Sequence, residues 1–354
     1  MKLLIEAANA AIGVYDGRIV EPDGPFDVVL RTPGGRIRPG LINAHDHLHR
    51  NHYGRLGKGG YPNAYEWGRD IHARDAAQIA SGKRVPRRRA LLRGAWKNLL
   101  AGVTTVVHHD RWEEDFDGDF PIRVARTRWA HSPGLEPELA AASSGTGAFA
   151  IHLAEGTDAA AAEEVRELDR LGLLTRDLLA VHAVGVDADG VARLRASGAA
   201  VVWCPTSNLF LLGCTAPPSL LAPGMDVLLG SDSLLSGEGS LLDEIRVARE
   251  LGLVSDKRLL EAVGCLAARR LGLAEPSLEP GEVADLAVFT RPLLEAGSAD
   301  VALVMVGGVV RVLDPGLVPE LGRLARGGRL VRAGGVTRWV NQRPRAPRIR
   351  RQTR

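Results

Sequence analysis

The sequence predicts an α/β fold of the TIM-like (β/α) barrel type, with a small β-sandwich domain assembled from both chain ends. Apolar runs with strand character alternate with helical stretches through the middle of the chain, which is typical of a parallel sheet. Short β-prone runs separated by turn residues occupy both ends. A length of 354 residues accommodates one large barrel and a satellite domain.

The two ends carry hairpin signals. Asp16 and Gly17 separate two β-prone runs, and Gly307 and Gly308 separate two longer apolar runs, as tight turns require. We therefore predict that residues 1–38 and 280–336 form the β domain. The barrel is predicted to occupy residues 39–279, inserted between these two parts.

The last residues, 337–354, form a basic tail that is predicted to be disordered. The tail carries seven arginines and no acid, so the net charge of +3 becomes 3 − 7 = −4 for the rest of the chain. No nucleic-acid-binding motif accompanies the tail, and we expect no specific nucleic-acid partner.

The composition predicts a cytoplasmic protein. Glu6 interrupts the N-terminal apolar run too early for a signal peptide, and no apolar run approaches the roughly 18 residues of a membrane span. Three cysteines are too few for a disulfide framework, which agrees with a reducing compartment.

The barrel region is short between its second and fifth strands. Residues 88–102 have helical periodicity and end at Gly102, and Asp158 is placed to cap another helix. Only 151 − 106 = 45 residues separate Val106 from Ile151, whereas complete strand–helix units require more. We assign one strand there, 120–132, and one short helix, and predict a barrel shortened or distorted around strands three and four.

Histidines and one aspartate follow successive predicted strands, where barrel active sites lie. His45 and His47 are two residues apart on a strand, so both side chains point to one face. Alone, such a pair is as well explained by two polar rim residues. The pattern continues at later strand ends with His152, His182 and Asp232. Imidazole and carboxylate ligands together suit zinc or iron.

Five segments, in order, resemble the motifs of the amidohydrolase superfamily. They are PGLINAHDHLH (39–49), IHLAEG (151–156), VHAVG (181–185), WCPTSNLFLLG (203–213) and GSDS (230–233). The fourth resembles the Cys-Pro-x-Ser-Asn stretch of the branch that contains cytosine and guanine deaminases and triazine hydrolases. GEVADLAVF (281–289) resembles the return strand of that superfamily's satellite β domain.

The resemblance implies a role for each matched residue. His45, His47, His152 and Asp232 are expected to bind one divalent metal, zinc in the first place and iron as the alternative. Glu155 is expected to be a proton shuttle, and His182 to hydrogen-bond the catalytic water.

The chemistry of these groups agrees with those roles. A bound divalent ion lowers the pKa of water from about 15.7 to about 7, which provides hydroxide at neutral pH. Asp232 can then accept a proton while Glu155 donates one to a ring nitrogen. No lysine lies between Lys97 and Lys257, so the bridging lysine of binuclear relatives has no counterpart and one metal is predicted.

Substrate contacts are harder to predict. Trp67, His109 and Asn208 are the candidates, each with a packing role as the alternative. Tyr61, Tyr65 and Trp67 lie in a long loop expected to cover the pocket. In the short region of the barrel, the side chains available to contact a substrate are those of Arg126, Arg128 and His131.

The predicted function is metal-dependent deamination of an amino-substituted heterocycle or related amidine by metal-bound hydroxide. Hydrolysis of a cyclic amide or a C–Cl bond at the same site is the alternative, and a non-catalytic binding module is the third hypothesis. The expected partners are a small-molecule substrate and a second copy in a homodimer, with no membrane.

Overall fold

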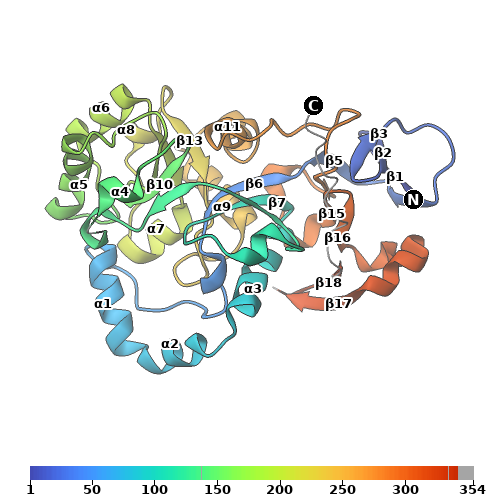
Figure 1. The fold of residues 1–354 in the computed structure, drawn as a ribbon, viewed down its shortest axis with the longest axis horizontal. Helices are drawn as coiled ribbons and strands as arrows, with labels where there is room; N and C mark the ends of the chain where they lie inside the picture. Colours follow the sequence, from blue (N-terminus) through green and yellow to red (C-terminus); the bar gives the residue numbers. More distant parts are fainter. Residues whose placement is uncertain (137, 334, 342–354) are drawn as a thin grey trace.

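The computed structural model describes residues 1–136, 138–333 and 335–341. Figure 1 shows two parts: parallel strands surrounded by helices on one side, and antiparallel strands from both chain ends on the other. Two separate groups of buried apolar side chains form the cores of these parts.

The parallel strands lie in two sheets. The first contains β6 (Leu41–Asp46), β7 (Val103–His108) and β8 (Arg123–Ala125). The second contains β9 (Arg128–Ala130), β10 (Phe149–Leu153), β11 (Leu178–His182), β12 (Ala200–Trp203) and β13 (Asp226–Leu229). After β13 the chain approaches β6, because the backbone N–H groups of Ser231 and Asp232 donate to the carbonyl of His45, at 3.0 and 3.1 Å.

The junction between the two sheets departs from regular strand–helix alternation. Only residues 126–127 separate β8 from β9, so no helix lies between them. β8 pairs with β7 and β9 pairs with β10, both in parallel. One extended stretch therefore connects the sheets, and it lies within the strand predicted at 120–132. The short predicted helix that follows is α4 (Leu139–Ala142).

Helices flank the strands. They are α3 (Arg87–Leu99), α5 (Ala159–Arg170), α6 (Ala188–Ser197), α7 (Pro205–Leu212), α8 (Pro218–Leu221), α9 (Leu241–Leu251), α10 (Asp256–Ala262) and α11 (Cys265–Arg270). The predicted cap of α5 is confirmed, since Asp158 accepts from the N–H of Ala161 at 3.0 Å. The predicted stop after α3 is confirmed as well: Gly102 has φ +80°.

The segment after β6 is helical, and the prediction of a loop there is wrong. It forms α1 (Ala64–Arg74) and α2 (Ala76–Lys83), drawn in blue away from the strands in Figure 1. Asn63 caps α1 by accepting from the N–H of Glu66 at 2.8 Å. The sequence signal is weak because α2 has hardly any amphipathic periodicity. We call α1 and α2 together the helical cover.

Strands from both chain ends pair in the β domain. One sheet contains β1 (Lys2–Ala7), β2 (Ala11–Tyr15), β3 (Arg18–Val20) and β4 (Val28–Thr32). The other contains β5 (Arg36–Pro39), β14 (Leu286–Phe289), β15 (Val301–Val306), β16 (Val309–Leu313), β17 (Gly328–Ala333) and β18 (Val336–Asn341). The pairing of β5 with β14 joins the two ends of the chain, and both predicted turns are present.

Strand β18 extends into the predicted tail. Residues 337–341 belong to β18, so the prediction of disorder is wrong for them. Arg338 is buried, and its guanidinium donates to the carbonyls of Val301 and Ala299 at 2.9 and 2.6 Å. The sequence favours a solvated charge at this position because it does not show which carbonyls the arginine meets. The rest of the predicted tail, 342–354, lies outside the described residues.

The helices within residues 1–136, 138–333 and 335–341 do not meet the requirements of a membrane span. No helix in these ranges has the length and apolar character that a span requires.

Candidate active site

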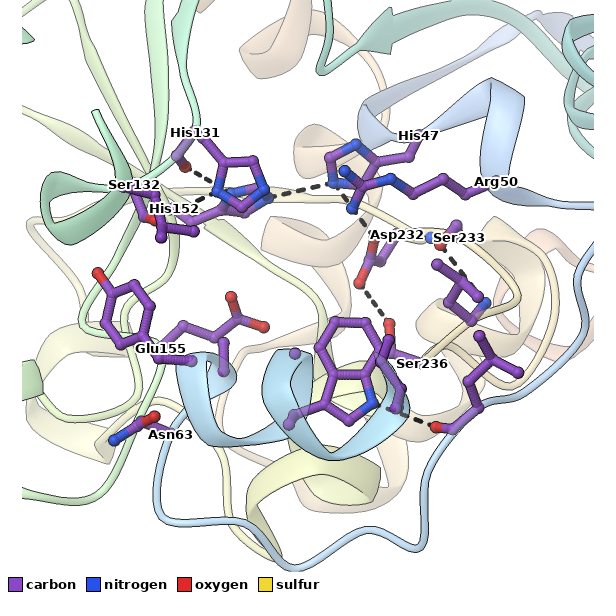
Figure 2. Close-up of a pocket in the computed structure, with 18 of the residues that line it drawn as sticks. His47, Arg50, Asn63, His131, Ser132, His152, Glu155, Asp232, Ser233 and Ser236 are labelled. Carbon is purple, nitrogen blue, oxygen red and sulfur yellow. Dashed lines mark hydrogen bonds and ion pairs between the residues drawn. The ribbon is translucent and has the colours of Figure 1, made fainter. Parts of the chain in front are cut away.

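The carboxyl ends of the parallel strands open into a cavity of about 1050 Å³ (Figure 2). His47, His152, Glu155, His182 and Asp232 line its floor. The helical cover forms much of the opposite wall. The apolar and aromatic side chains of this wall are Tyr53, Leu56, Tyr65, Trp67, Ile71 and Ile79.

The predicted metal ligands converge at the floor. His47 Nε2 lies 3.2 Å from His152 Nε2 and 3.8 Å from Asp232 Oδ1. His45 Nε2 lies 3.7 Å from the same carboxylate oxygen. Two overlapping sets each have donor atoms within 4.8 Å of one another: His45 with His182 and Asp232, and His45 with His109 and His152. His182 and His109 therefore join the predicted ligands in one cluster.

The chemistry of this cluster fits a divalent cation. Both ring nitrogens of His45 and Nδ1 of His47 are buried without a hydrogen-bond partner, which is costly unless something binds them. Burial lowers the pKa values of His45, His47 and His152, so these rings are neutral and able to act as ligands. We retain His45, His47, His152 and Asp232 as the predicted ligand set.

Neighbouring groups orient the cluster. His152 donates from Nδ1 to the carbonyl of His131 at 2.6 Å, which leaves Nε2 facing His47. Ser207 and Ser236 each donate to Asp232 Oδ2, at 2.9 and 2.5 Å. Asp232 Oδ1, the oxygen nearer the histidines, accepts only from the N–H of Ser233 at 2.7 Å among the described residues, and its second lone pair can meet a ligand.

The backbone is strained at three of these strand ends. Ala154, His182 and Asp232 have φ angles of +50°, +70° and +47°. Left-handed conformations are unfavourable for residues with a Cβ and are tolerated where the surrounding structure enforces them. Such strain concentrates at functional sites, which agrees with the position of the cavity.

Glu155 and Asp232 occupy contrasting environments. Burial raises the pKa of Glu155 to about 7. Burial also acts to raise the pKa of Asp232, but its contacts with His45 and His182 and the hydrogen bond from Ser236 outweigh it and hold that pKa far below the ordinary value. Two carboxyl groups with separated pKa values in one cavity are the arrangement that acid–base catalysis requires.

His182 links Glu155 to a polar residue behind it. Its Nδ1 lies 2.8 Å from Asn208 Oδ1, which can only accept, so Nδ1 carries the proton. Its Nε2 then presents a lone pair 3.5 Å from Glu155 Oε1. Asn208 is therefore in position to fix the orientation of the ring.

The helical cover is tied to the Glu155 segment. Tyr65 donates to Glu164 Oε1 at 2.6 Å, and Glu164 Oε2 accepts from the N–H of Ala154 at 2.7 Å. The N–H of Ala64 also donates to the carbonyl of Glu155, at 2.9 Å. Movement of α1 is thereby coupled to the position of Glu155.

The predicted substrate residues separate into two groups. Trp67 lines the cavity, although its indole N–H donates to the carbonyl of Leu56 at 3.1 Å. His109 and Asn208 are buried behind the floor, with the His109 ring stacked 4.2 Å from that of His152. Tyr65 lines the cavity with Trp67, whereas Tyr61 donates to Asp70.

Arg126 and Arg128 do not reach the cavity, contrary to the prediction. Arg126 stacks on Trp112 and pairs with Asp117 at the surface. Arg128 donates to the carbonyl of Ser143. His131 does line the cavity. The stretch through β8 and β9 pairs with a different strand at each end, and sequence alone does not fix which of its side chains face inward.

Four residues of the site are not singled out by the sequence. Ser207 lies within the Cys-Pro-x-Ser-Asn stretch, and Ser236 follows Asp232 by four residues. These positions are the sequence signal by which both hydrogen-bond donors of Asp232 could have been predicted. Lys97 donates to the carbonyl of Asp232 at 2.6 Å. Arg50 lines the cavity three residues after His47. The sequence around Lys97 and Arg50 does not distinguish either of them from a basic residue on the surface.

A model of the amidohydrolase family matches residues 138–311, which include the strand ends of Glu155, His182 and Asp232. Over these residues the chain matches the amidohydrolase family. This confirms the family predicted from the five sequence motifs.

Two curated relatives of this amidohydrolase are deaminases. An aminodeoxyfutalosine deaminase of Deinococcus radiodurans is 40% identical over 121 residues, 33% of this chain and 29% of that protein. A 5-methylthioadenosine/S-adenosylhomocysteine deaminase of Moorella thermoacetica is 32% identical over 215 residues, 54% of this chain and 49% of that protein. The chain spans about half or less of the length of these relatives.

A solved structure supports the fold. The atrazine chlorohydrolase of Arthrobacter aurescens, complexed with zinc, is similar with a TM-score of 0.67 at 18% identity, covering 87% of this chain and 94% of that chain. The likeness agrees with a TIM-like barrel as the common architecture.

Proposed function

We propose that this amidohydrolase deaminates an amino-substituted heterocycle or related amidine by hydrolysis. The observation that carries the proposal is the pair of carboxyl groups in one cavity: Glu155, with its pKa raised to about 7, and Asp232, with its pKa far below the ordinary range. Hydrolysis of a C=N bond needs a proton donor and a proton acceptor at the same time.

We propose His45, His47, His152 and Asp232 as ligands of one divalent ion, with zinc preferred and iron as the alternative. The buried unpartnered nitrogens of His45 and His47 and the neutral state of the rings support this set. When bound, such an ion supplies a water acidified to a pKa of about 7. Zinc is favoured because it accepts mixed imidazole and carboxylate ligands.

The chain's own groups handle the protons. Protonated Glu155 donates to the ring nitrogen of the substrate as the water oxygen bonds to the amino-bearing carbon, and ionised Asp232 accepts the proton of the water. His182 Nε2, 3.5 Å from Glu155 Oε1, holds that carboxyl in place. Breakage of the exocyclic C–N bond then releases ammonia, which takes up the proton from Asp232, while the hydroxyl on the same carbon returns a proton to Glu155 as the C=O bond forms.

Relatives support deamination over the alternatives. Both curated relatives are named for the removal of an amino group from an adenosine-like compound. The chlorohydrolase likeness concerns the fold, so hydrolysis of a C–Cl bond or a cyclic amide remains the second candidate. Product mass separates these reactions, since deamination exchanges an amine for oxygen and ring opening adds water.

The test is ammonia release by the zinc-loaded full chain from adenosine, 5-methylthioadenosine, S-adenosylhomocysteine, cytosine and guanine. We expect release from at least one, and a loss of about 10²–10⁴-fold in Glu155→Gln with zinc retained. Glu163→Gln changes an exposed glutamate on α5 and is the matched control, with activity unchanged. Full activity in Glu155→Gln contradicts the proposed acid.

A further inference from the structure

Arg50 introduces a cation into the cavity that the proposed reaction does not use. It ends a single helical turn, Leu48–Arg50, that follows the histidine pair of β6. Figure 2 shows its side chain directed past His47 towards Asp232. Its position so near the floor places the guanidinium beside the groups that handle protons.

The guanidinium of Arg50 has no hydrogen bond or ion pair within the part of the chain that the structure describes. Burial lowers its pKa, and the charges of Asp232, Asp110 and Glu155 offset this only in part. By contrast, the buried Arg338 donates to several backbone carbonyls. The Arg50 guanidinium lines the cavity, so a ligand bound there can supply the acceptors that the protein does not.

The carboxyl groups of the cavity are engaged elsewhere. Asp232 lies against His45 and His47 and accepts from Ser207 and Ser236. Glu155 Oε1 lies 3.5 Å from His182 Nε2. Within the described residues, neither carboxylate accepts a hydrogen bond from Arg50.

We infer that Arg50 binds a carboxylate of the substrate, attached to or next to the ring that carries the reacting amino group. A planar guanidinium donates two parallel hydrogen bonds to a carboxylate, which fixes orientation as well as adding affinity. The inference rests on the proposed function for the identity of the reacting group, but carboxylate binding can be measured without turnover.

The apolar wall of the cavity defines the rest of the ligand. Leu56, Ile71, Ile79 and Leu235 form a buried apolar cluster beneath the helical cover, and Trp67 packs against it. An apolar or aromatic group extending from the ring fits this wall. The substrate class is thus an amino-heterocycle with a carboxylate close to the reacting carbon and an apolar substituent on the other side.

The experiment compares three probes of similar shape by calorimetric titration of the zinc-loaded full chain. Benzoate carries the carboxylate, benzamide is its neutral counterpart, and benzenesulfonate is an oxyanion with less affinity for zinc. We expect both anions to bind about 10- to 100-fold more tightly than benzamide. Arg50→Gln should remove this preference, whereas Arg50→Lys should retain part of it.

Two controls separate Arg50 from other sources of positive charge. Lys83→Gln neutralises an exposed cation at the cavity's outer edge, and Arg93→Gln neutralises an exposed cation on α3. Both should keep the anion preference, with zinc content and melting temperature showing that every variant is folded. An unchanged preference in Arg50→Gln, or its loss in Lys83→Gln, overturns the inference.

Failure of the proposed function would look different. Anion preference that depends on Arg50, together with no ammonia release from any amino-heterocycle, refutes the deaminase and keeps the carboxylate site. Ammonia release with no anion preference in the unchanged protein refutes the carboxylate site and keeps the deaminase.

Discussion

The two halves of the barrel differ in regularity, and the difference separates chemistry from substrate choice. From β10 to β13 each strand is followed by helix, and the family match covers this half. From β6 to β9 the chain inserts the helical cover and then connects β8 to β9 through two residues. The regular half supplies the proton-handling groups Glu155, His182 and Asp232, whereas the irregular half supplies Arg50, most of the cavity wall and two of the proposed metal ligands, His45 and His47.

Glu155 and His182 follow strands that are paired on both sides, whereas Asp232 follows β13, which pairs with β12 and is joined to β6 by the bonds to the carbonyl of His45. Each strand of β10–β12 pairs with two others, so its end is fixed in space. The cover is held to the floor by single contacts such as Tyr65 with Glu164. Substitutions should therefore have the largest effects at the strand ends of the regular half and smaller effects at the cover.

The largest effect is expected for Asp232→Asn. The amide can no longer accept the proton of the water and is a poorer metal ligand, so activity should fall by about 10³-fold or more. Zinc content measured by atomic absorption should fall as well. Asp226→Asn, at the start of β13 and half exposed, is the matched control with activity retained. Equal losses in both variants would show a structural defect of β13.

The sequence also predicts the structure of the regular half more completely than that of the irregular half. Alternating apolar runs and helix caps mark β10–β13 and α5, and the histidines and aspartate at strand ends follow from the parallel arrangement. Arg50 is missed because a lone arginine after a strand resembles a surface charge. Arg126 and Arg128 are misassigned because the orientation of the stretch through β8 and β9 follows from tertiary pairing. In the helical cover, α2 has hardly any amphipathic periodicity, so the sequence gives little sign of that helix.

An intermediate effect is expected from pH. Burial raises the pKa of Glu155 to about 7, so below pH 7 the acid is protonated and competent as a donor. Above pH 7 it loses that proton, and kcat/KM should fall about tenfold per pH unit. Rates measured from pH 5.5 to 9 on zinc-loaded protein check this. If kcat/KM of Glu155→Gln still falls above pH 7 in the same way, a group other than Glu155 causes the fall.

The smallest effect is expected at the contact that joins the cover to the floor. Tyr65→Phe removes a donor from Glu164 and an acceptor from the N–H of Gly134, 3.1 Å from the hydroxyl. We expect a loss of about 1–2 kcal/mol in the free energy of unfolding, measured with urea, and a modest fall in kcat as Glu155 loosens. Tyr15→Phe, exposed in the β domain, is the control. If kcat stays constant while stability falls, the contact between Tyr65 and Glu164 stabilises the helical cover alone. The irregular half is then coupled to the reacting groups through the backbone hydrogen bond from Ala64 to Glu155.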